Sequence, residues 1–500
     1  MTVIDLLNEA AKGFPDKTAF QDSDHAVTYS KLKDLTDRIA SALAEMIKSN
    51  TSPVVVFIDR NIESICTMLG VAASRNFYIP VDGTQPASRV QVILDQMMPS
   101  AVVSIGGSMP EGVKLPDHAV QLAYEDLINH EIDRERLDRI RAEAKEDDPL
   151  FAICTSGSTG IPKGVIKSHR SVLSFVPAFA EIFGFDEHEV FGNQAPFDFD
   201  VSAKDIYTTI YTRATLYIIP RVCFSMPKLL INVFEEQKLT TIVWAVSALC
   251  IVAAVNAFKK QAPVTLKKIL FSGEVMPIKM LNIWRSWLPD ALFVNLYGPT
   301  EVMGNCTYYI VDREFDLTEK LPLGVPFPNV EVFYLNDRKE PIHEGEQGDI
   351  YVTGDSLAMG YYHNQEKTNE VFLQDFLGDG RMIYKTGDLA ELRNGEYYFT
   401  ARRDFQIKHM GHRIELEEIE LHLNAVDGVT RASCLFDSVK NKIIAIYSGE
   451  ADKAQIVNAL KNDLPKYMIP TVYMRMETLP INKNGKIDRQ RIKELYEKGE

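Results

Sequence analysis

The chain has 500 residues, a mass of 56.4 kDa and a formal net charge of −15, with a pI near 5.3. Hydrophobic residues make up 46% and charged residues 25%, the balance of a soluble globular protein, which excludes a disordered chain or a fibre. The acidic pI argues against nucleic-acid binding, which needs a basic face, and the length favours two or three domain-sized units.

The first part of the chain alternates short β-branched runs with segments of helical periodicity. Strands are predicted at residues 51–58, 77–82 and 101–106, and helices at residues 60–75 and 87–97. This alternation indicates an α/β fold with layered, largely parallel sheets.

The N-terminus and the cysteines bear on the compartment in which the protein works. Asp5 and Glu9 interrupt the first apolar stretch, so no signal peptide is expected. The 6 cysteines form no CxxC pair and are too sparse for a disulfide framework. We expect a cytoplasmic protein with reduced thiols.

One uncharged run, from Leu239 to Phe258, is long enough to span a membrane. Threonine, serine and asparagine dilute its apolar character, and it divides naturally at Ser247. We predict a buried strand over residues 240–246 and then a helix over residues 247–258 that Ser247 caps, rather than a membrane span.

The pattern changes toward the C-terminus. Hairpins are predicted over residues 378–408, and an amphipathic helix over residues 413–426. Residues 1–404 carry a formal charge of −16 and residues 405–500 carry +1. The acidity therefore belongs to the larger part of the chain.

A segment rich in glycine and hydroxyl groups, ICTSGSTGIPKGV, spans residues 153–165. Glycines let backbone N–H groups approach an anion, while the hydroxyls and Lys163 add donors and positive charge. The segment does not match the GxxxxGK[ST] pattern of the P-loop NTPases. We interpret it as a phosphate-binding loop of another kind, the alternative being a turn that binds nothing.

Three further turns carry polar side chains. NLYGPTE offers the Tyr297 ring, the Thr300 hydroxyl and the Glu301 carboxylate; YKTGDL offers Asp388; and LPINKNGKIDR offers Lys486. Each alone reads equally well as a solvent-facing turn. Together with the glycine-rich segment they suit a nucleoside triphosphate and Mg²⁺.

These motifs carry a resemblance to a known family. TSGSTGIPKG, NLYGPTE, YKTGDL, ARRDFQIKHMGHRIELEEIE, LPKYMIP and LPINKNGKIDR occur in the order found in adenylate-forming enzymes. That superfamily includes acyl-CoA synthetases, luciferases and the adenylation domains of nonribosomal peptide synthetases. The resemblance covers essentially the whole chain and is strongest to stand-alone D-alanine:D-alanyl carrier protein ligases.

The resemblance implies an ATP site. Its members would be Thr155, Ser156, Gly157, Ser158, Thr159, Gly160 and Lys163 at the phosphates, Gly273, Glu274, Asn295, Tyr297 and Gly298 near the adenine, and Asp388 and Arg402 at the ribose. Lys163 would also act in catalysis, with Thr300 at the α-phosphate, Glu301 facing Mg²⁺ and Lys486 bridging the substrate carboxylate and the adenylate.

The resemblance also implies two domains that move. Residues 1–403, layered α/β sheets with a β-subdomain, would bind ATP and the acid, and residues 404–500 would form a small α+β lid hinged at Asp404. Gly411 would then lie beside a pantetheine tunnel. The hinge reads Ala401-Arg402-Arg403-Asp404 where the family usually has glycine first, and alanine restricts φ.

Asp200 bears on which acid is activated. It matches the position that holds the α-ammonium group in amino-acid-activating members, although an aspartate capping the following helix is the alternative. The resemblance places the acid pocket at Asp200, Val201, Lys204, Ala245, Leu270, Ser272, Leu296, Gly304 and Asn305.

Two pocket residues depart from the D-alanine enzymes. Ser272 replaces a cysteine, and Lys204 replaces an apolar residue. A buried lysine needs a partner, which would be Asp198, Asp205 or a carboxylate of the substrate. The last option favours an acidic or polar substrate side chain; alternatively Lys204 turns outward and the substrate is D-alanine or another small amino acid.

The expected activity is ATP-dependent formation of an aminoacyl-adenylate, then transfer to the phosphopantetheine thiol of a separate carrier protein. No carrier segment follows KIDRQRIKELYEKGE, so the acceptor is expected in trans. The alternatives are an acyl-CoA synthetase for a non-amino acid and a degenerate member without activity. Neither a nucleic-acid partner nor a membrane span is expected.

Overall fold

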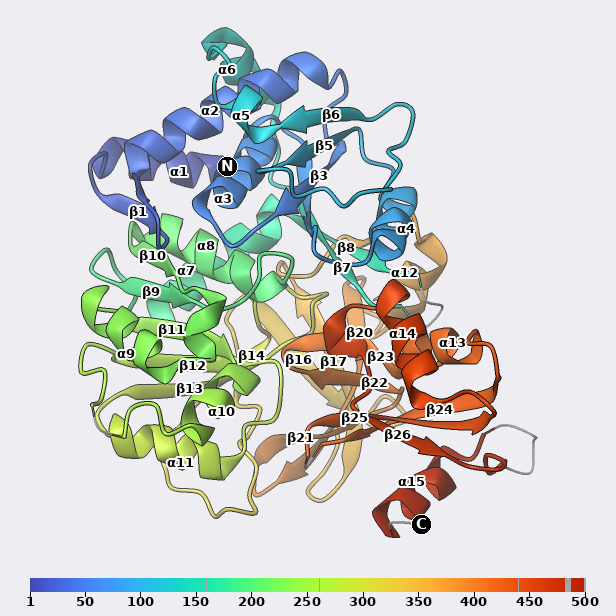
Figure 1. Ribbon diagram of the computed structural model, residues 1–500. Coiled ribbons are helices and arrows are strands. Elements are labelled where there is room, and N and C mark those ends of the chain that lie inside the picture. Colours follow the sequence, from blue (N-terminus) through green and yellow to red (C-terminus); the bar gives the residue numbers. More distant parts are fainter. Residues whose placement is uncertain (158–160, 260, 439, 482–486, 499–500) are drawn as a thin grey trace.

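The structure is a computed structural model that describes residues 1–157, 161–259, 261–438, 440–481 and 487–498. Three sheets form the large body of the molecule, and the elements after residue 405 form a smaller lobe beside it (Figure 1). We call residues 406–498 the C-terminal lobe. No helix among the described residues has the length and apolar character needed to cross a membrane.

The largest sheet has nine strands in the order β15-β14-β13-β12-β11-β9-β10-β1-β2. All neighbours from β13 to β1 run parallel, so their carboxyl ends lie along one edge. The strands are β1 (Thr18–Gln21), β2 (Ala26–Thr28), β9 (Val190–Asn193), β10 (Thr215–Ile218), β11 (Thr241–Ala245), β12 (Lys268–Ser272), β13 (Leu292–Tyr297), β14 (Thr307–Ile310) and β15 (Val325–Pro326).

A second sheet of seven strands confirms the alternation predicted from the sequence. Its parallel half contains the three predicted strands, and the two predicted helices, α3 (Ile62–Ala73) and α4 (Ala87–Met97), connect them. Its strands are β3 (Pro53–Ile58), β4 (Phe77–Asp82), β5 (Ala101–Ser104), β6 (Val120–Ala123), β7 (Pro149–Thr155), β8 (Lys163–Ser168) and β18 (Gly360–Tyr361).

Helices pack between and around these sheets, and the main hydrophobic core lies among them (Figure 1). Buried tyrosines anchor the helices. The Tyr29 hydroxyl donates to the carbonyls of Thr209 and Ala214, and the hydroxyl oxygens of Tyr78 and Tyr207 lie 2.9 Å apart. The helices of the body are α1 (Val3–Gly13), α2 (Tyr29–Met46), α5 (Tyr124–Leu127), α6 (Arg134–Glu143), α7 (His169–Phe183), α8 (Asp200–Thr212), α9 (Pro227–Glu236), α10 (Val246–Ala254), α11 (Ile278–Trp287) and α12 (Gln365–Val371).

The uncharged run from Leu239 to Phe258 forms a buried strand and a helix, as predicted. The predicted cap is wrong, because α10 begins at Val246, one residue before Ser247. The Ser247 side chain instead hydrogen-bonds to the Glu274 carboxylate. The helix also ends at Ala254, earlier than predicted.

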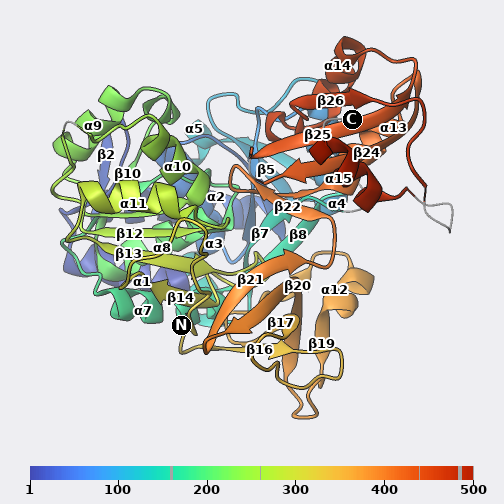
Figure 2. The same ribbon diagram turned by 90° about the horizontal axis from the view of Figure 1, so that it is seen from below.

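A third, antiparallel sheet continues the body toward the C-terminal lobe (Figure 2). Its last hairpin, β20 paired with β21, falls within the zone in which hairpins were predicted. The strands are β16 (Val330–Leu335), β17 (Gln347–Gly354), β19 (Phe372–Gln374), β20 (Met382–Arg393) and β21 (Glu396–Arg402).

The C-terminal lobe has a hydrophobic core of its own. The helix predicted over residues 413–426 is shorter than expected, because residues up to Glu415 pair as a strand. The lobe contains β22 (Gln406–His409), β23 (His412–Glu415), α13 (Leu416–Asn424), β24 (Val429–Asp437), β25 (Lys442–Gly449), α14 (Lys453–Asp463), β26 (Val472–Arg475) and α15 (Arg489–Lys498).

Candidate functional site

The candidate site lies at the carboxyl edge of the large sheet. Strands β11, β12 and β13 run parallel and end at Ala245, Ser272 and Tyr297. In open α/β sheets, ligands bind in the crevice outside this edge. Gly298 follows β13 so tightly that a Cβ there would lie 2.8 Å from the Asn305 Cα, which explains the need for glycine.

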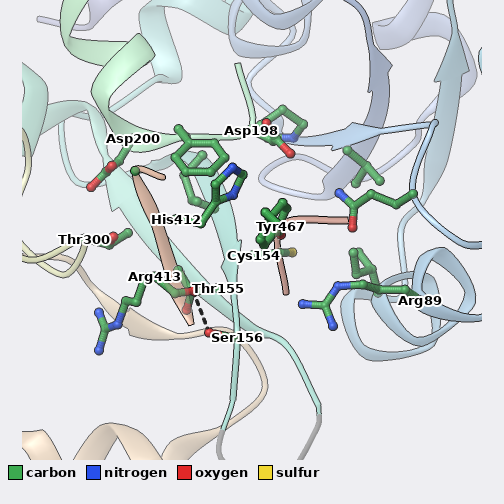
Figure 3. A pocket seen from close by; sticks show the side chains of 17 residues that line it. Arg89, Cys154, Thr155, Ser156, Asp198, Asp200, Thr300, His412, Arg413 and Tyr467 are labelled. Atoms are coloured by element: carbon green, nitrogen blue, oxygen red, sulfur yellow. Dashed lines mark hydrogen bonds between the residues drawn. The ribbon is translucent and has the colours of Figure 1, made fainter. Parts of the chain in front are cut away.

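A cavity of about 80 Å³ lies between the body, chiefly β4, α4 and β7 of the second sheet, and the C-terminal lobe (Figure 3). Asp200 and Thr300 line it on one side, and His412 and Arg413 of the lobe face it. Arg89, Asp198 and Tyr467 line it further along. The cavity therefore belongs to both parts of the chain.

The β22–β23 hairpin brings the lobe into the site. Its turn residue Gly411 has a φ of +82°, and its N–H donates to the Glu274 Oε1 at 2.7 Å. A Cβ on Gly411 would lie 3.2 Å from the Ala245 Cβ, so the hairpin tip touches the end of β11. Residues far apart in sequence are thereby joined at the sheet edge.

Glu301 forms a deeply buried charged contact with the C-terminal lobe. Its side chain is 1% exposed and accepts hydrogen bonds at 2.6 Å from the Tyr361 hydroxyl and at 2.6 Å from Arg413 Nη1. Burial acts to raise the pKa of Glu301, but the charge of Arg413 and these hydrogen bonds dominate and lower it to about 2. Glu301 is therefore ionised and held by a residue of the lobe.

The phosphate-loop candidate also contacts the lobe. The Ser156 hydroxyl donates to the Arg413 carbonyl at 2.8 Å and accepts from the Glu415 N–H at 3.2 Å. Thr155 and Lys163 are cross-strand partners on β7 and β8, so these two residues stand at the two ends of the connection between the strands. Burial lowers the pKa of Lys163.

Asp388 lies on β20 directly opposite Arg402 on β21. It forms an ion pair with Arg402 and accepts a hydrogen bond from the Tyr297 hydroxyl at 2.6 Å. Arg402 also reaches the Asp404 carboxylate through two donors, at 2.7 and 2.8 Å. The ribose candidates and the hinge candidate therefore form one network.

Replacing Tyr297 by phenylalanine is expected to lower the free energy of unfolding by about 1–3 kcal/mol, because the buried Asp388 carboxylate loses a donor while the ring is retained. Denaturant titration measures the change. Tyr309→Phe is the matched control, since its hydroxyl makes an exposed contact to Asp312. Equal stability of both variants would contradict the prediction.

Asp200 is the first residue of α8, and its side chain lines the cavity. The helix has Phe199 at its N-cap position and no side-chain cap, so the capping alternative for Asp200 is wrong. The other acid-pocket candidates lie on α8, on β11 to β13 or in the loop after β13. They are Val201, Ala245, Leu270, Ser272, Leu296, Gly304 and Asn305.

Lys204 does not turn outward. Its side chain is 0% exposed, and its amine donates to Asn305 Oδ1 at 2.8 Å and lies 5.5 Å from the centre of the Phe179 ring. Neither Asp198 nor Asp205 forms an ion pair with it among the described residues, although Asp205 is within electrostatic range. Burial lowers the pKa of Lys204 to about 8, against the attraction of Asp205 and Asp200.

Four predicted site residues fall outside the part of the chain that the structure describes. They are Ser158, Thr159, Gly160 and Lys486. Around that gap, Gly157 is required by packing, because a Cβ there would lie 2.2 Å from the Ile161 carbonyl oxygen. Gly273, with a φ of +95°, Glu274 and Asn295 all lie at or just beyond the ends of β12 and β13.

The sequence by itself predicts no role for Arg413, Tyr361 or Lys167. Arg413 stood within a recognised motif, but only the tertiary structure pairs it with Glu301. Lys167 lies on β8 four residues after Lys163, and residues separated by an even number share one face of a strand. That spacing was the signal that could have found Lys167.

Comparisons with known proteins agree with this geometry. The profile of the family described as AMP-binding enzyme matches residues 7–362. D-alanine--D-alanyl carrier protein ligases of Bacillus cereus and Bacillus cytotoxicus are each 31% identical, over 98% of this chain and 99% of theirs.

Solved structures share the fold. IdnL1 superposes with a TM-score of 0.80 at 26% identity, over 95% of this chain and 98% of its own. The Vibrio cholerae adenylation domain AlmE, solved with glycyl-adenosine-5'-phosphate, gives a TM-score of 0.83 at 18% identity, over 99% of this chain and 98% of that one. At that identity the second likeness shows the fold alone.

Proposed function

Because this chain belongs to the AMP-binding enzyme family and is an adenylate-forming ligase, we propose that it activates an amino acid with ATP and transfers it to a carrier protein. The acceptor would be the phosphopantetheine thiol of a separate carrier. The relatives named as carrier protein ligases support this acceptor, since they match almost the whole chain.

One observation supports the amino acid in particular. Asp200 opens α8 without capping it and presents its carboxylate to the cavity near Thr300 (Figure 3). A carboxylate in that place attracts the α-ammonium group of an amino acid, a group that a simple fatty or aryl acid lacks. The buried Lys204 lies one helical turn after Asp200 on α8 and favours a substrate with a polar or acidic side chain, with D-alanine left open.

The first step requires charge neutralisation rather than a general base. The substrate carboxylate is already ionised; it attacks the α-phosphorus of ATP, and pyrophosphate leaves. Ser156, Lys163 and Thr300 would contact the phosphates, and Asp388 would accept the ribose hydroxyls. Lys486 would bridge the two reacting anions.

Mg²⁺ fits this proposal through Glu301, whose carboxylate is buried and ionised. When bound, the ion would neutralise charge on the phosphates. In the arrangement described here, Arg413 occupies Glu301 Oε2, so the fit requires the lobe to withdraw. The β22–β23 hairpin and the metal therefore compete for one carboxylate.

The docked hairpin suits the second step. A thiol attacks the adenylate carbonyl, a thioester forms, its proton leaves to solvent and AMP departs. Gly411 lines the cavity between lobe and body, where a narrow pantetheine arm would reach the reacting carbonyl without meeting a side chain. The lobe would therefore dock in this way after adenylation.

Pyrophosphate exchange across a panel of amino acids and simple carboxylic acids tests the first step. Exchange with amino acids only is expected, and loss of it in Asp200→Ala supports the ammonium site. Thioester formation with a phosphopantetheinylated carrier and with free coenzyme A tests the acceptor. Equally fast turnover with coenzyme A, or a preference for non-amino acids, would instead indicate an acyl-CoA synthetase.

The division into residues 1–403 and a lid of residues 404–500 is part of this proposal. Asp404→Pro is expected to reduce thioester formation at least about tenfold while pyrophosphate exchange stays within about threefold, because proline restricts φ at the hinge. Rapid-quench assays of both steps measure this. Ala401→Pro, three residues earlier on β21, is the positional control; equal loss of both steps in Asp404→Pro would contradict the hinge.

A further inference from the structure

Two lysine amines are buried in the body close to Asp200. Lys204 on α8 and Lys167 on β8 both have side chains that are 0% exposed. The Lys204 amine makes one hydrogen bond, to Asn305, and the Lys167 amine has no hydrogen-bond partner among the described residues. An ammonium group has three donors, so most of this donor capacity is unused.

Both amines lie near the Asn305–Cys306 segment. Lys204 contacts Asn305, and the next residue, Cys306, lies within electrostatic range of Lys167. Burial lowers the pKa of Lys167 to about 7 and that of Lys204 to about 8, against the attraction of Asp200 on both amines and the larger attraction of Asp205 on Lys204. Asp200, which lines the cavity, is therefore within electrostatic range of both amines.

The cost of this arrangement calls for a ligand. A buried ammonium group without a partner costs several kcal/mol, and replacement by an apolar side chain of similar length would remove that cost. Asp205 is the strongest attraction on the Lys204 amine, but it forms no ion pair with it among the described residues, and its Oδ2 accepts from Asn193 at 2.9 Å. Glu301 is held by Arg413 and Tyr361. The Lys167 amine therefore keeps no hydrogen-bond partner among the described residues, and an anionic group of a substrate would give it one and give Lys204 a second.

We propose that the acid activated by this enzyme carries a second carboxylate, which Lys204 and Lys167 bind. This inference rests on the proposed amino-acid activation, in which Asp200 holds the α-ammonium group. The substrate class is then the acidic amino acids, with a side chain of the length of aspartate or glutamate. Lys167 becomes a specificity residue that lies outside the pocket set expected from the family resemblance.

Pyrophosphate exchange with the D and L forms of aspartate and glutamate, compared with asparagine, glutamine and alanine, tests the proposal. The acids are expected to exceed their amides by about 100-fold in kcat/KM, since an amide leaves the ammonium groups without a counter-charge. Lys204→Met and Lys167→Met are expected to raise KM for the acid and reduce this ratio at least about tenfold. Lys204→Arg should recover part of the preference.

Stability distinguishes a binding role from a structural one. Lys167→Met is expected to raise Tm, because an unpartnered amine leaves the interior. Lys12→Met, at an exposed position of α1, should change neither Tm nor KM and serves as the control. A higher Tm with an unchanged KM for the acid would overturn the assignment of Lys167.

The outcomes separate this inference from the proposed function. Exchange with alanine and the amides as fast as with the acids would overturn the inference and leave amino-acid activation standing. Absence of exchange with every acid, in a folded enzyme, would overturn both.

Discussion

Replacing Glu301 by glutamine is expected to reduce pyrophosphate exchange by about 100-fold or more and to loosen the C-terminal lobe. Glu301 pairs with Arg413 in the docked arrangement, and in the proposed adenylation step its charge would instead serve the metal. With an amide at this position neither is neutralised, and Arg413 would be left as a buried charge without its partner, at a cost of about 3–5 kcal/mol.

Tyr361→Phe is the control for this prediction. It removes the hydrogen bond to Glu301 Oε1 but keeps the charge, so exchange is expected to fall less than about tenfold. Exchange rates measured over a range of Mg²⁺ concentrations compare the two variants. Near-normal exchange in Glu301→Gln would show that this carboxylate has no part in adenylation.

The low pKa of Glu301 also fixes how docking depends on pH. Arg413 and the hydrogen bonds hold the pKa at about 2, against burial and below the ordinary value of 4.5. Because Glu301 is easier to ionise in the folded, docked state than in the unfolded chain, its ionised carboxylate stabilises that state above pH 4.5. This contribution is lost as the pH falls toward 2 and the carboxylate becomes protonated. In Glu301→Gln that part of the acid dependence should be absent.

The second large effect is expected at the ion pair between Arg89 on α4 and Glu418 on α13, which joins the body to the lobe. Both side chains are buried. Either Arg89→Met or Glu418→Met leaves the other charge buried and unpaired, at about 3–5 kcal/mol. The docked arrangement should become rare, and thioester formation should fall about 100-fold while pyrophosphate exchange changes less than about threefold.

The double variant gives the matched control. Arg89→Met combined with Glu418→Met removes both charges and leaves an apolar contact, so thioester formation should recover most of the loss. Single-turnover transfer from preformed adenylate to carrier isolates the step. If the fold-reduction in transfer rate of the double variant equals the product of the two single fold-reductions, the two residues act independently and do not form a docking pair.

Local patterns predicted the parallel half of the second sheet well. The strand runs and the periodicity leading to α3 and α4 depend on neighbours along the chain, and the structure contains them close to the predicted bounds. The predictions that were wrong concerned the ends of helices. Ser247 has the chemistry of a helix cap, but its hydroxyl hydrogen-bonds to Glu274, and α10 begins one residue before it. Tertiary contacts overrode the local preference there.

By itself the sequence determined the family, the α/β class and the set of motifs at the site, because those motifs need particular residues at particular spacings. Only the tertiary structure decided the partners of the charged groups. It buried Lys204 against Asn305, placed Arg413 of the lobe on Glu301, and left the Lys167 amine within electrostatic range of Asp200 but without a hydrogen bond among the described residues. Charge pairing depends on residues up to hundreds of positions apart, and burial decides how strongly each pair acts, so neither can be deduced from spacing along the chain.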